Sequence, residues 1–326
     1  MLRQFESKDS KTREAAGKSL AKMGPRILPV LLSALKDASP NVREGAAFTI
    51  MEIGLPAASA VPDLAVALQD ESPAVRGAAA FALLSMGTEG KAAIPQLVKA
   101  VGDRDWTVRV AACTALRCIG REMALRRIRE ELGIVVPALA EALKDPDYRV
   151  RQASARALKE YGPDARSAIP ALTGLLNDVE HETFADAFGA LGAIGPEAKV
   201  AVPQILEGLR KDDWRIRQCA AWTLGHIEPA AEETIQAMIQ ALKDKEPYVR
   251  DAAVEALGNI GAGAVPGLVQ MLKSDDLVAR ETAAGALGKI GPEAQVAIDA
   301  LKEALKDTDE NVRAAAAGAI KSIQGN

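Results

Sequence analysis

A phrase that begins with Val-Arg recurs along the chain and constrains its fold more than any other feature. It reads VRDAAVEALGNIG from Val249, and related phrases begin at Val75, Val108, Val150 and Val312. Val249, Ala253, Leu257 and Ile260 fall on one face of a helix with 3.6 residues per turn. Gly261 follows them and suits a helix end in the left-handed conformation. The recurrence predicts a repeat protein.

The arginine of this phrase gives the register. It recurs mostly every 33 residues, with 30 at two steps, 42 at one and 66 at one, where Phe184 stands midway. An aspartate usually precedes it by six residues. The two columns comprise Asp37, Arg43, Asp70, Arg76, Asp103, Arg109, Asp145, Arg151, Arg217, Asp244, Arg250, Arg280, Asp307 and Arg313. We interpret them as a structural ladder that ties adjacent repeats and caps helix starts, and not as a phosphate-binding ladder.

Each repeat is expected to hold a helix A, a short turn and a helix B with the Val-Arg phrase. No window alternates apolar and polar residues, so we predict an all-α fold, a right-handed α-solenoid with a period of about 33 residues. Prolines such as Pro62 and Pro95 are expected inside helix A and to kink it. We expect a single solenoid over 1–326, with a partial repeat at 1–24 and repeats at 25–54, 55–87, 88–120, 121–162, 163–195, 196–228, 229–261, 262–291 and 292–326.

Two local features complete this organisation. Residues 121–132, REMALRRIREEL, contain an insertion that we interpret as an extended helix A. The chain ends in KSIQGN without an obviously polar capping helix, and an exposed end of a repeat array favours end-to-end self-association.

Composition narrows the classes of partner. A net charge of −4 and a pI near 5.5 disfavour nucleic-acid binding. No run of 18 apolar residues and no apolar signal core follows Met1, so we expect a soluble, cytoplasmic protein without a membrane partner. Cys113, Cys118 and Cys219 have no metal or redox spacing and are interpreted as reduced thiols in the packing.

The stretch AVPDLAVALQDESPAVRGAAAFALLSMG from Ala60, and the block from Ala138 to Gly162, resemble the short HEAT-like repeats of the bilin-lyase type, also called E-Z or PBS-lyase repeats. The resemblance covers the whole chain and implies the solenoid fold. Families with such repeats include bilin lyases, a di-iron hydroxylase, DNA-repair glycosylases and many scaffolds. The di-iron family places His-Glu pairs directly after the Val-Arg phrase, whereas here His181-Glu182 precedes the helix and His226 is the one other histidine. We therefore predict no metal site and no cofactor.

Aromatic residues interrupt the repeat and are the candidates for partner binding. Trp106, Tyr148, His181 and Trp214 occupy one turn position in four consecutive repeats, and Tyr248 follows, displaced by one residue. Equivalent positions of stacked repeats line up, so they predict an aromatic stripe. Further candidates are Phe184, Phe188, Trp222 and His226, with Phe48 and Phe81 in the column of Trp222.

We interpret the chain as a non-catalytic scaffold for a protein or peptide, bound on the concave helix-B face or the aromatic edge. A bilin-lyase-like enzyme or small-molecule carrier that uses the same groove is the alternative. A designed array is a lesser alternative, because designed arrays usually keep one period. In each case the aromatics have a competing structural interpretation, in which they cover the ends of their own helices.

Overall fold

The computed structural model describes residues 2–7, 9–125, 131–178, 183–227 and 231–325, and every regular element in this part of the chain is a helix, as predicted. It divides into two compact units, Met1–Ala171 and Leu172–Asn326. The α-helices are α1 (Ser10–Ala21), α2 (Leu28–Ala34), α3 (Pro40–Ile53), α4 (Val61–Ala67), α5 (Pro73–Leu84), α6 (Ile94–Ala100), α7 (Trp106–Leu125), α8 (Leu132–Ala142), α9 (Tyr148–Tyr161), α10 (Ile169–Thr173), α11 (Thr183–Ile194), α12 (Val202–Gly208), α13 (Trp214–Ile227), α14 (Glu232–Ala241), α15 (Pro247–Ile260), α16 (Val265–Met271), α17 (Leu277–Ile290), α18 (Ile298–Ala304) and α19 (Glu310–Gln324).

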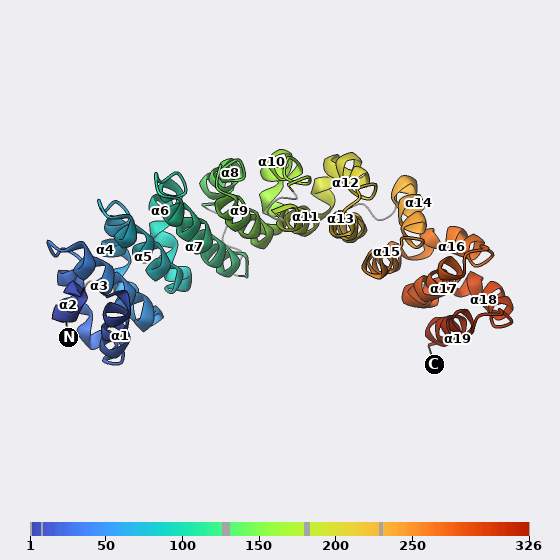
Figure 1. Ribbon diagram of the computed structural model, residues 1–326, viewed down its shortest axis with the longest axis horizontal. Helices are drawn as coiled ribbons and strands as arrows, with labels where there is room; N and C mark the ends of the chain where they lie inside the picture. The colour runs from blue at the N-terminus through green and yellow to red at the C-terminus, as the bar shows by residue number, and fades with distance from the viewer. Residues whose placement is uncertain (1, 8, 126–130, 179–182, 228–230, 326) are drawn as a thin grey trace. The chain divides into compact units, whose positions relative to one another are not determined.

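Each repeat is a pair of antiparallel helices, and the pairs stack within each unit. Helices α1, α3, α5, α7 and α9 carry the recurring arginine in the first unit and pack in sequence on one another. Helices α11, α13, α15, α17 and α19 pack in the same way in the second unit. We call these the B helices. Figure 1 shows them in one row of each unit, with the shorter even-numbered helices in a second row. Alanine and leucine fill the space between the rows, as at the fully buried Ala79, Leu83 and Leu97.

The expected kinks in helix A are replaced by a change of helix type. A 3₁₀ helix precedes the α-helix in most repeats: η2 (Gly24–Ile27), η3 (Leu55–Ala60), η4 (Gly87–Ala93), η5 (Gly162–Ala168), η6 (Gly195–Ala201), η7 (Gly261–Ala264) and η8 (Gly291–Ala297). A further one, η1 (Leu2–Glu6), lies before α1. Pro62 and Pro95 are therefore the second residues of α4 and α6, where the missing N–H leaves no helix hydrogen bond unmade.

The insertion lengthens a B helix, α7, and the helix A that follows, α8, has 11 residues where most have seven. In most repeats the B helix ends at a glycine with positive φ, such as Gly54 at φ 70°. Gly261 has φ 71° and ψ −140°, a conformation open to glycine but distinct from the left-handed helical one that we expected. Gly120 is different: it lies inside the 20-residue α7, with the Tyr161 ring packed over it. Helix α7 therefore continues to Leu125, and residues 126–130 of the insertion lie outside the described residues.

One stretch, Pro247–Met271, is long and apolar enough to cross a membrane by length and composition, with a mean hydropathy of 1.3. The sequence analysis did not anticipate it. In the structure this stretch is two helices of the repeat array, α15 and α16, separated by the short 3₁₀ helix η7 at Gly261. Alanine, valine, leucine and isoleucine account for the mean hydropathy of this stretch, and 39% of its most apolar window is buried in the structure.

Candidate functional site

Two surfaces collect the residues that the sequence singles out. The first, which we call the turn edge, consists of the turns before the B helices and the first residues of those helices. The second is the B-helix face, the side of the B helices that points away from the even-numbered helices. The arginine and aspartate columns build the turn edge and hold its side chains in place.

Five ladder arginines in the described residues pair with an aspartate of the following repeat. Each donates from Nε and Nη2 to both carboxylate oxygens, at N···O distances between 2.6 and 3.1 Å. The pairs are Arg43–Asp70, Arg76–Asp103, Arg109–Asp145, Arg217–Asp244 and Arg280–Asp307. The residue six positions earlier, an aspartate in three of the five cases, offers this arginine its backbone carbonyl, as when Arg76 Nη1 donates to Asp70 O at 2.8 Å. Each arginine therefore bridges its own turn to the next one.

The surroundings of Asp244 show how the aspartate is held. Its Oδ1 accepts a hydrogen bond from the Glu246 N–H at 2.9 Å in addition to the bond from Arg217 Nη2. Burial raises the pKa of the Asp244 carboxyl, but the hydrogen bonds from Arg217 and Glu246 outweigh it and hold this pKa below its usual value. The carboxylate therefore remains charged and fixes the start of α15.

Three of the predicted ladder positions depart from this pairing. Arg250 donates to the carbonyl oxygens of Asp244 and Lys245, at 2.8 and 3.2 Å, and the next aspartate position holds Ser274. Arg313, in the last repeat, donates to the carbonyl oxygens of its own turn. Asp37 accepts the Ser39 N–H at 2.8 Å. Arg151 donates to the carbonyl oxygens of Asp145 and Pro146, the same backbone contacts that the five paired arginines make in their own turns.

The two departures at Asp37 and Arg250 coincide with the two 30-residue steps. In both steps the 3₁₀ helix before helix A has four residues, η2 and η7, whereas η3 has six and η4, η5, η6 and η8 have seven. Arg13, which precedes the first short step, pairs with Glu44 at 3.3 Å. The shortened connectors therefore go with a changed contact between turns.

In the first unit the turn edge carries a cluster of Trp106, Tyr148 and Arg149. The Arg149 guanidinium lies 3.3 Å from the centre of the Trp106 ring and 5.7 Å from that of Tyr148. Asp147 holds this guanidinium through two hydrogen bonds, from Nε at 2.9 Å and from Nη2 at 2.7 Å, and they lower the pKa of Asp147 to about 2. Trp106 is 36% exposed. The cluster is therefore held in one arrangement and still open to solvent.

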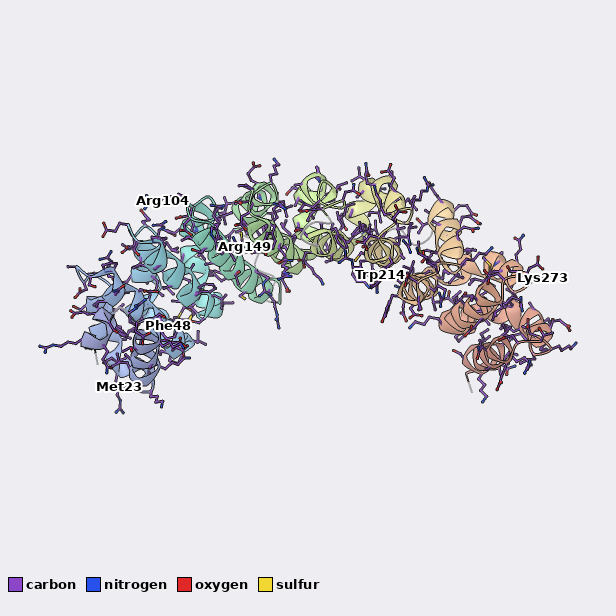
Figure 2. The ribbon with its side chains drawn as sticks, viewed as in Figure 1. Met23, Phe48, Arg104, Arg149, Trp214 and Lys273 are labelled. Carbon is purple, nitrogen blue, oxygen red and sulfur yellow. The ribbon has the colours of Figure 1, made fainter. Side chains whose placement is uncertain are left out.

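The second unit carries a smaller cluster at the same edge. The rings of Trp214 and Tyr248 stack with their centres 5.2 Å apart and an angle of 26° between their planes. Tyr248 is 58% exposed, and Trp214 is partly exposed. His181, the remaining member of the predicted stripe, lies outside the described residues. Figure 2 labels Arg149 on the first unit and Trp214 on the second.

Phe184 and Phe188 do not belong to a binding surface. Both are 1% exposed and pack in the core of the second unit. Phe184 stands in the arginine column, where the arginine side chains are themselves buried, so a ring without charge packs inward. Arg215 lies near this ring, with its guanidinium carbon 5.9 Å from the ring centre. We remove both phenylalanines from the set of candidates.

The B-helix face of the second unit exposes Trp222 and His226. Their rings stack with centres 4.1 Å apart, and His226 Nδ1 lies 2.7 Å from the Trp222 carbonyl oxygen. The Trp222 ring packs over Gly192 of the neighbouring α11, where a Cβ atom would come within 2.5 Å of it. Trp222 is nevertheless 37% exposed. One edge of the Trp222 ring therefore packs against the neighbouring helix, and part of the ring surface remains exposed to solvent.

The B-helix face of the first unit is hollowed into a groove of about 420 Å³. Phe48, Met51 and Phe81 form its apolar part, and Figure 2 shows Phe48 among the B helices. Ser10, Arg13, Glu14, Glu44 and Thr107 line its polar rim, and Gly45, Pro73, Ala74, Gly77 and Ala78 line the rest. The aromatic column of the sequence predicted Phe48 and Phe81 as candidates for binding. The periodicity did not single out Met51 or Gly77 from the other residues of their helices.

Two observations concern the possible metal ligands and the thiols in the described part of the chain. Among the described residues, no group of three or more His, Cys, Asp or Glu side chains is arranged to hold a metal ion. Burial raises the pKa of the Cys113 thiol to about 12 and that of Cys219 to about 11, which keeps both thiols protonated at neutral pH.

Comparison with known proteins supports a repeat architecture over the whole chain. The profile of HEAT repeats matches residues 1–66, 61–133, 121–192, 182–257 and 235–321. It does not distinguish the bilin-lyase type that the sequence suggested. No curated protein matches the chain.

Among solved structures, an engineered protein is 26% identical, with a TM-score of 0.59, and the match covers 99% of this chain and 98% of that one. Importin beta is 18% identical (TM-score 0.67), and Kap121p is 16% identical (TM-score 0.66). Both matches cover 99% of this chain, which spans 50% of the importin beta chain and 40% of Kap121p. These two likenesses show the fold alone.

Proposed function

The chain belongs to the HEAT-repeat family, and from this we propose that it is a non-catalytic scaffold that binds a protein or peptide partner. The turn edge and the B-helix face are the surfaces proposed for binding. A solenoid has no single enclosed core site, and its extended faces suit a macromolecular partner.

The observation that carries the proposal is the cluster of Trp106, Tyr148 and Arg149 at the turn edge. Tryptophan, tyrosine and arginine are the residue types enriched among binding hot spots. The cation–π contact at 3.3 Å and the Asp147 ion pair fix these side chains before any partner arrives, which lowers the entropy cost of binding. The contact between Arg149 and Trp106 joins the starts of α7 and α9, and the exposed surface of the cluster is the part that we propose for binding.

A protein of the same fold gives independent support. Kap95p, 15% identical to this chain with a TM-score of 0.65, is described as binding RanGDP. The likeness concerns the fold, so neither that partner nor its site is transferred to this chain. It shows that stacked HEAT-type repeats serve to hold another protein.

Affinity capture from the source lysate tests the proposal, with the protein and two variants as bait. The first variant replaces Trp106, Tyr148 and Trp214 with alanine, and the matched control replaces Trp222, an exposed tryptophan of the B-helix face. We expect a protein partner that the wild type and the control retain and the triple variant loses. A partner lost by the control alone would move the site to the B-helix face of the second unit. A small molecule that copurifies in place of a protein would refute the scaffold function in favour of an enzyme or carrier.

A further inference from the structure

We propose that the groove on the B-helix face of the first unit binds a short segment of a protein partner that places a lysine or arginine beside bulky apolar side chains. This inference rests on the proposed scaffold function and names the chemistry of the bound segment. It concerns α1, α3, α5 and the start of α7.

The apolar part of the groove is shaped to receive a side chain. Phe81 is 40% exposed, and Phe48 and Met51 are partly exposed beside it. A Cβ atom added at Gly77 would meet nothing within 4 Å, so the wall of α5 is open at this point. The volume of about 420 Å³ lies within the range of about 300–1,000 Å³ that is usual for ligand sites. Bulky apolar side chains of a partner, such as leucine, would cover the phenylalanine rings and would themselves be removed from contact with water.

The charges of the rim favour a basic neighbour for these anchors. Two glutamates and one arginine line the groove, which leaves one excess negative charge. Arg13 is already engaged, because it donates to the Ser7 carbonyl oxygen at 3.0 Å and to Glu44 at 3.3 Å. Glu14 contacts Lys18, one turn along the same helix, and both side chains are about half exposed.

The Glu14–Lys18 contact does not oppose binding. An exposed ion pair four residues apart on a helix contributes little to stability, so a basic group of a partner can share or replace it. The apolar floor therefore supplies most of the affinity, and Glu14 supplies the preference for a positive charge over a negative one.

The groove also adjoins the turn edge. Thr107 lines the groove, and the residue before it, Trp106, belongs to the exposed aromatic cluster. A segment that crosses α3 and α5 in the groove would therefore continue toward Trp106. One partner can contact both surfaces of the first unit.

Fluorescence anisotropy with labelled synthetic peptides tests this inference on the full chain. The probe is Gly-Ser-Leu-Lys-Leu-Ser-Gly, compared with the same peptide in which glutamate replaces lysine and with one in which alanines replace the leucines. We expect the alanine peptide to bind at least about tenfold more weakly, because it buries less apolar surface. We expect the glutamate peptide to bind about two- to fivefold more weakly, as for an exposed charge pair.

Two substitutions assign the binding to the groove. Gly77→Leu places a side chain in the opening, at a position where an added Cβ meets nothing within 4 Å. Gly285→Leu is its matched control, a second glycine of a B helix with the same open surroundings of the added Cβ. We expect Gly77→Leu to weaken binding of the leucine–lysine peptide by about tenfold or more and Gly285→Leu to leave it unchanged. Both replace a helical glycine, so their melting temperatures should not fall. Glu14→Lys should reverse the preference between the lysine and glutamate peptides.

The outcomes separate this inference from the scaffold function. If no peptide binds the wild type, or if Gly77→Leu binds like Gly285→Leu, the groove proposal is wrong, while a partner captured through the turn edge would still support the scaffold. If Glu14→Lys leaves the order of peptides unchanged, the basic preference is wrong. Loss of a captured partner in Gly77→Leu but not in Gly285→Leu would support the groove in the natural complex.

Discussion

Replacing Arg217 with alanine is expected to destabilise the second unit considerably more than replacing Arg250 with alanine. Both arginines belong to the ladder, lie in consecutive repeats and donate from Nη1 to two carbonyl oxygens of their own turn. Arg217 alone adds a bidentate pair with Asp244, at 2.7 and 2.9 Å. The two substitutions therefore differ chiefly by one ion pair.

The magnitude follows from burial. The side chains of Arg217 and Asp244 are 9% and 14% exposed, and without Arg217 the carboxylate keeps the N–H of Glu246 as its remaining hydrogen bond. A buried acceptor left unsatisfied costs about 1–3 kcal/mol, and a charged one more. We therefore expect Arg217→Ala to cost about 3 kcal/mol in the free energy of unfolding, against about 1 kcal/mol for Arg250→Ala, which loses only the carbonyl contacts.

Urea denaturation followed by circular dichroism measures these differences, and a double-mutant cycle with Asp244→Ala isolates the pair. The coupling energy between Arg217 and Asp244 should be about 1.5–3 kcal/mol, within the range for residues in direct contact. A coupling below about 0.5 kcal/mol would place the pair among solvated surface ion pairs and refute the reasoning. Equal losses in Arg217→Ala and Arg250→Ala would refute it as well.

Four further outcomes are expected. Phe184→Ala should cost about 3–5 kcal/mol in a urea titration, because the ring is buried, and a loss below about 1 kcal/mol would mean that it faces solvent. The double change Trp106→Ala and Tyr148→Ala should alter stability by less than about 1 kcal/mol, and a larger loss would make the cluster structural. Cys113 should react with maleimide only upon unfolding, since it is fully buried and its thiol pKa is raised to about 12; rapid labelling of the native protein would contradict this. The folded-state pKa of Asp70 is lowered, so its charged form should stabilise the folded protein above the unfolded pKa of about 3.9, and this stabilisation should be lost as the pH falls below that value. Asp70→Asn should therefore flatten the dependence of the free energy of unfolding on pH between about pH 5 and 3.

The fold was predictable because the signal repeats. One Val-Arg phrase would be an ordinary amphipathic helix, but its return at a fixed period predicts stacking, and the family match and the all-helical structure confirm it. Local geometry was less accessible. Helix A begins as a 3₁₀ helix both where a proline is the second residue of its α-helix, as in α4, and before α18, where that residue is Asp299. The prediction of a kinked α-helix did not include this change of helix type.

The sequence also did not reveal which aspartate pairs with which arginine in the ladder. An aspartate six residues before an arginine looks closer to it than one 27 residues later, yet the carboxylate of the later aspartate makes the bidentate pair. The difference arises because stacking brings consecutive turns together, while the nearer carboxylate accepts an N–H two residues along its own turn. The interpretation of Phe184 as exposed was wrong for a related reason. The column otherwise holds arginine, a residue type that usually faces solvent, but the paired arginine side chains are largely buried, and so is the ring that replaces one of them.

The short connector η7 and the missing carboxylate at Ser274 have a consequence for how the array unfolds. In a stack in which each repeat contacts only its neighbours, stability is a sum of repeat terms and nearest-neighbour terms, and the weakest neighbour term decides where cooperativity breaks. The step from α15 to α17 lacks the ion pair that joins α13 to α15 and α17 to α19 through their turns. Opening should therefore be easier between α15 and α17 than at the flanking steps from α13 to α15 and from α17 to α19. We expect α16–α19 to separate as one block, and amide exchange in this block to proceed by a common sub-global event.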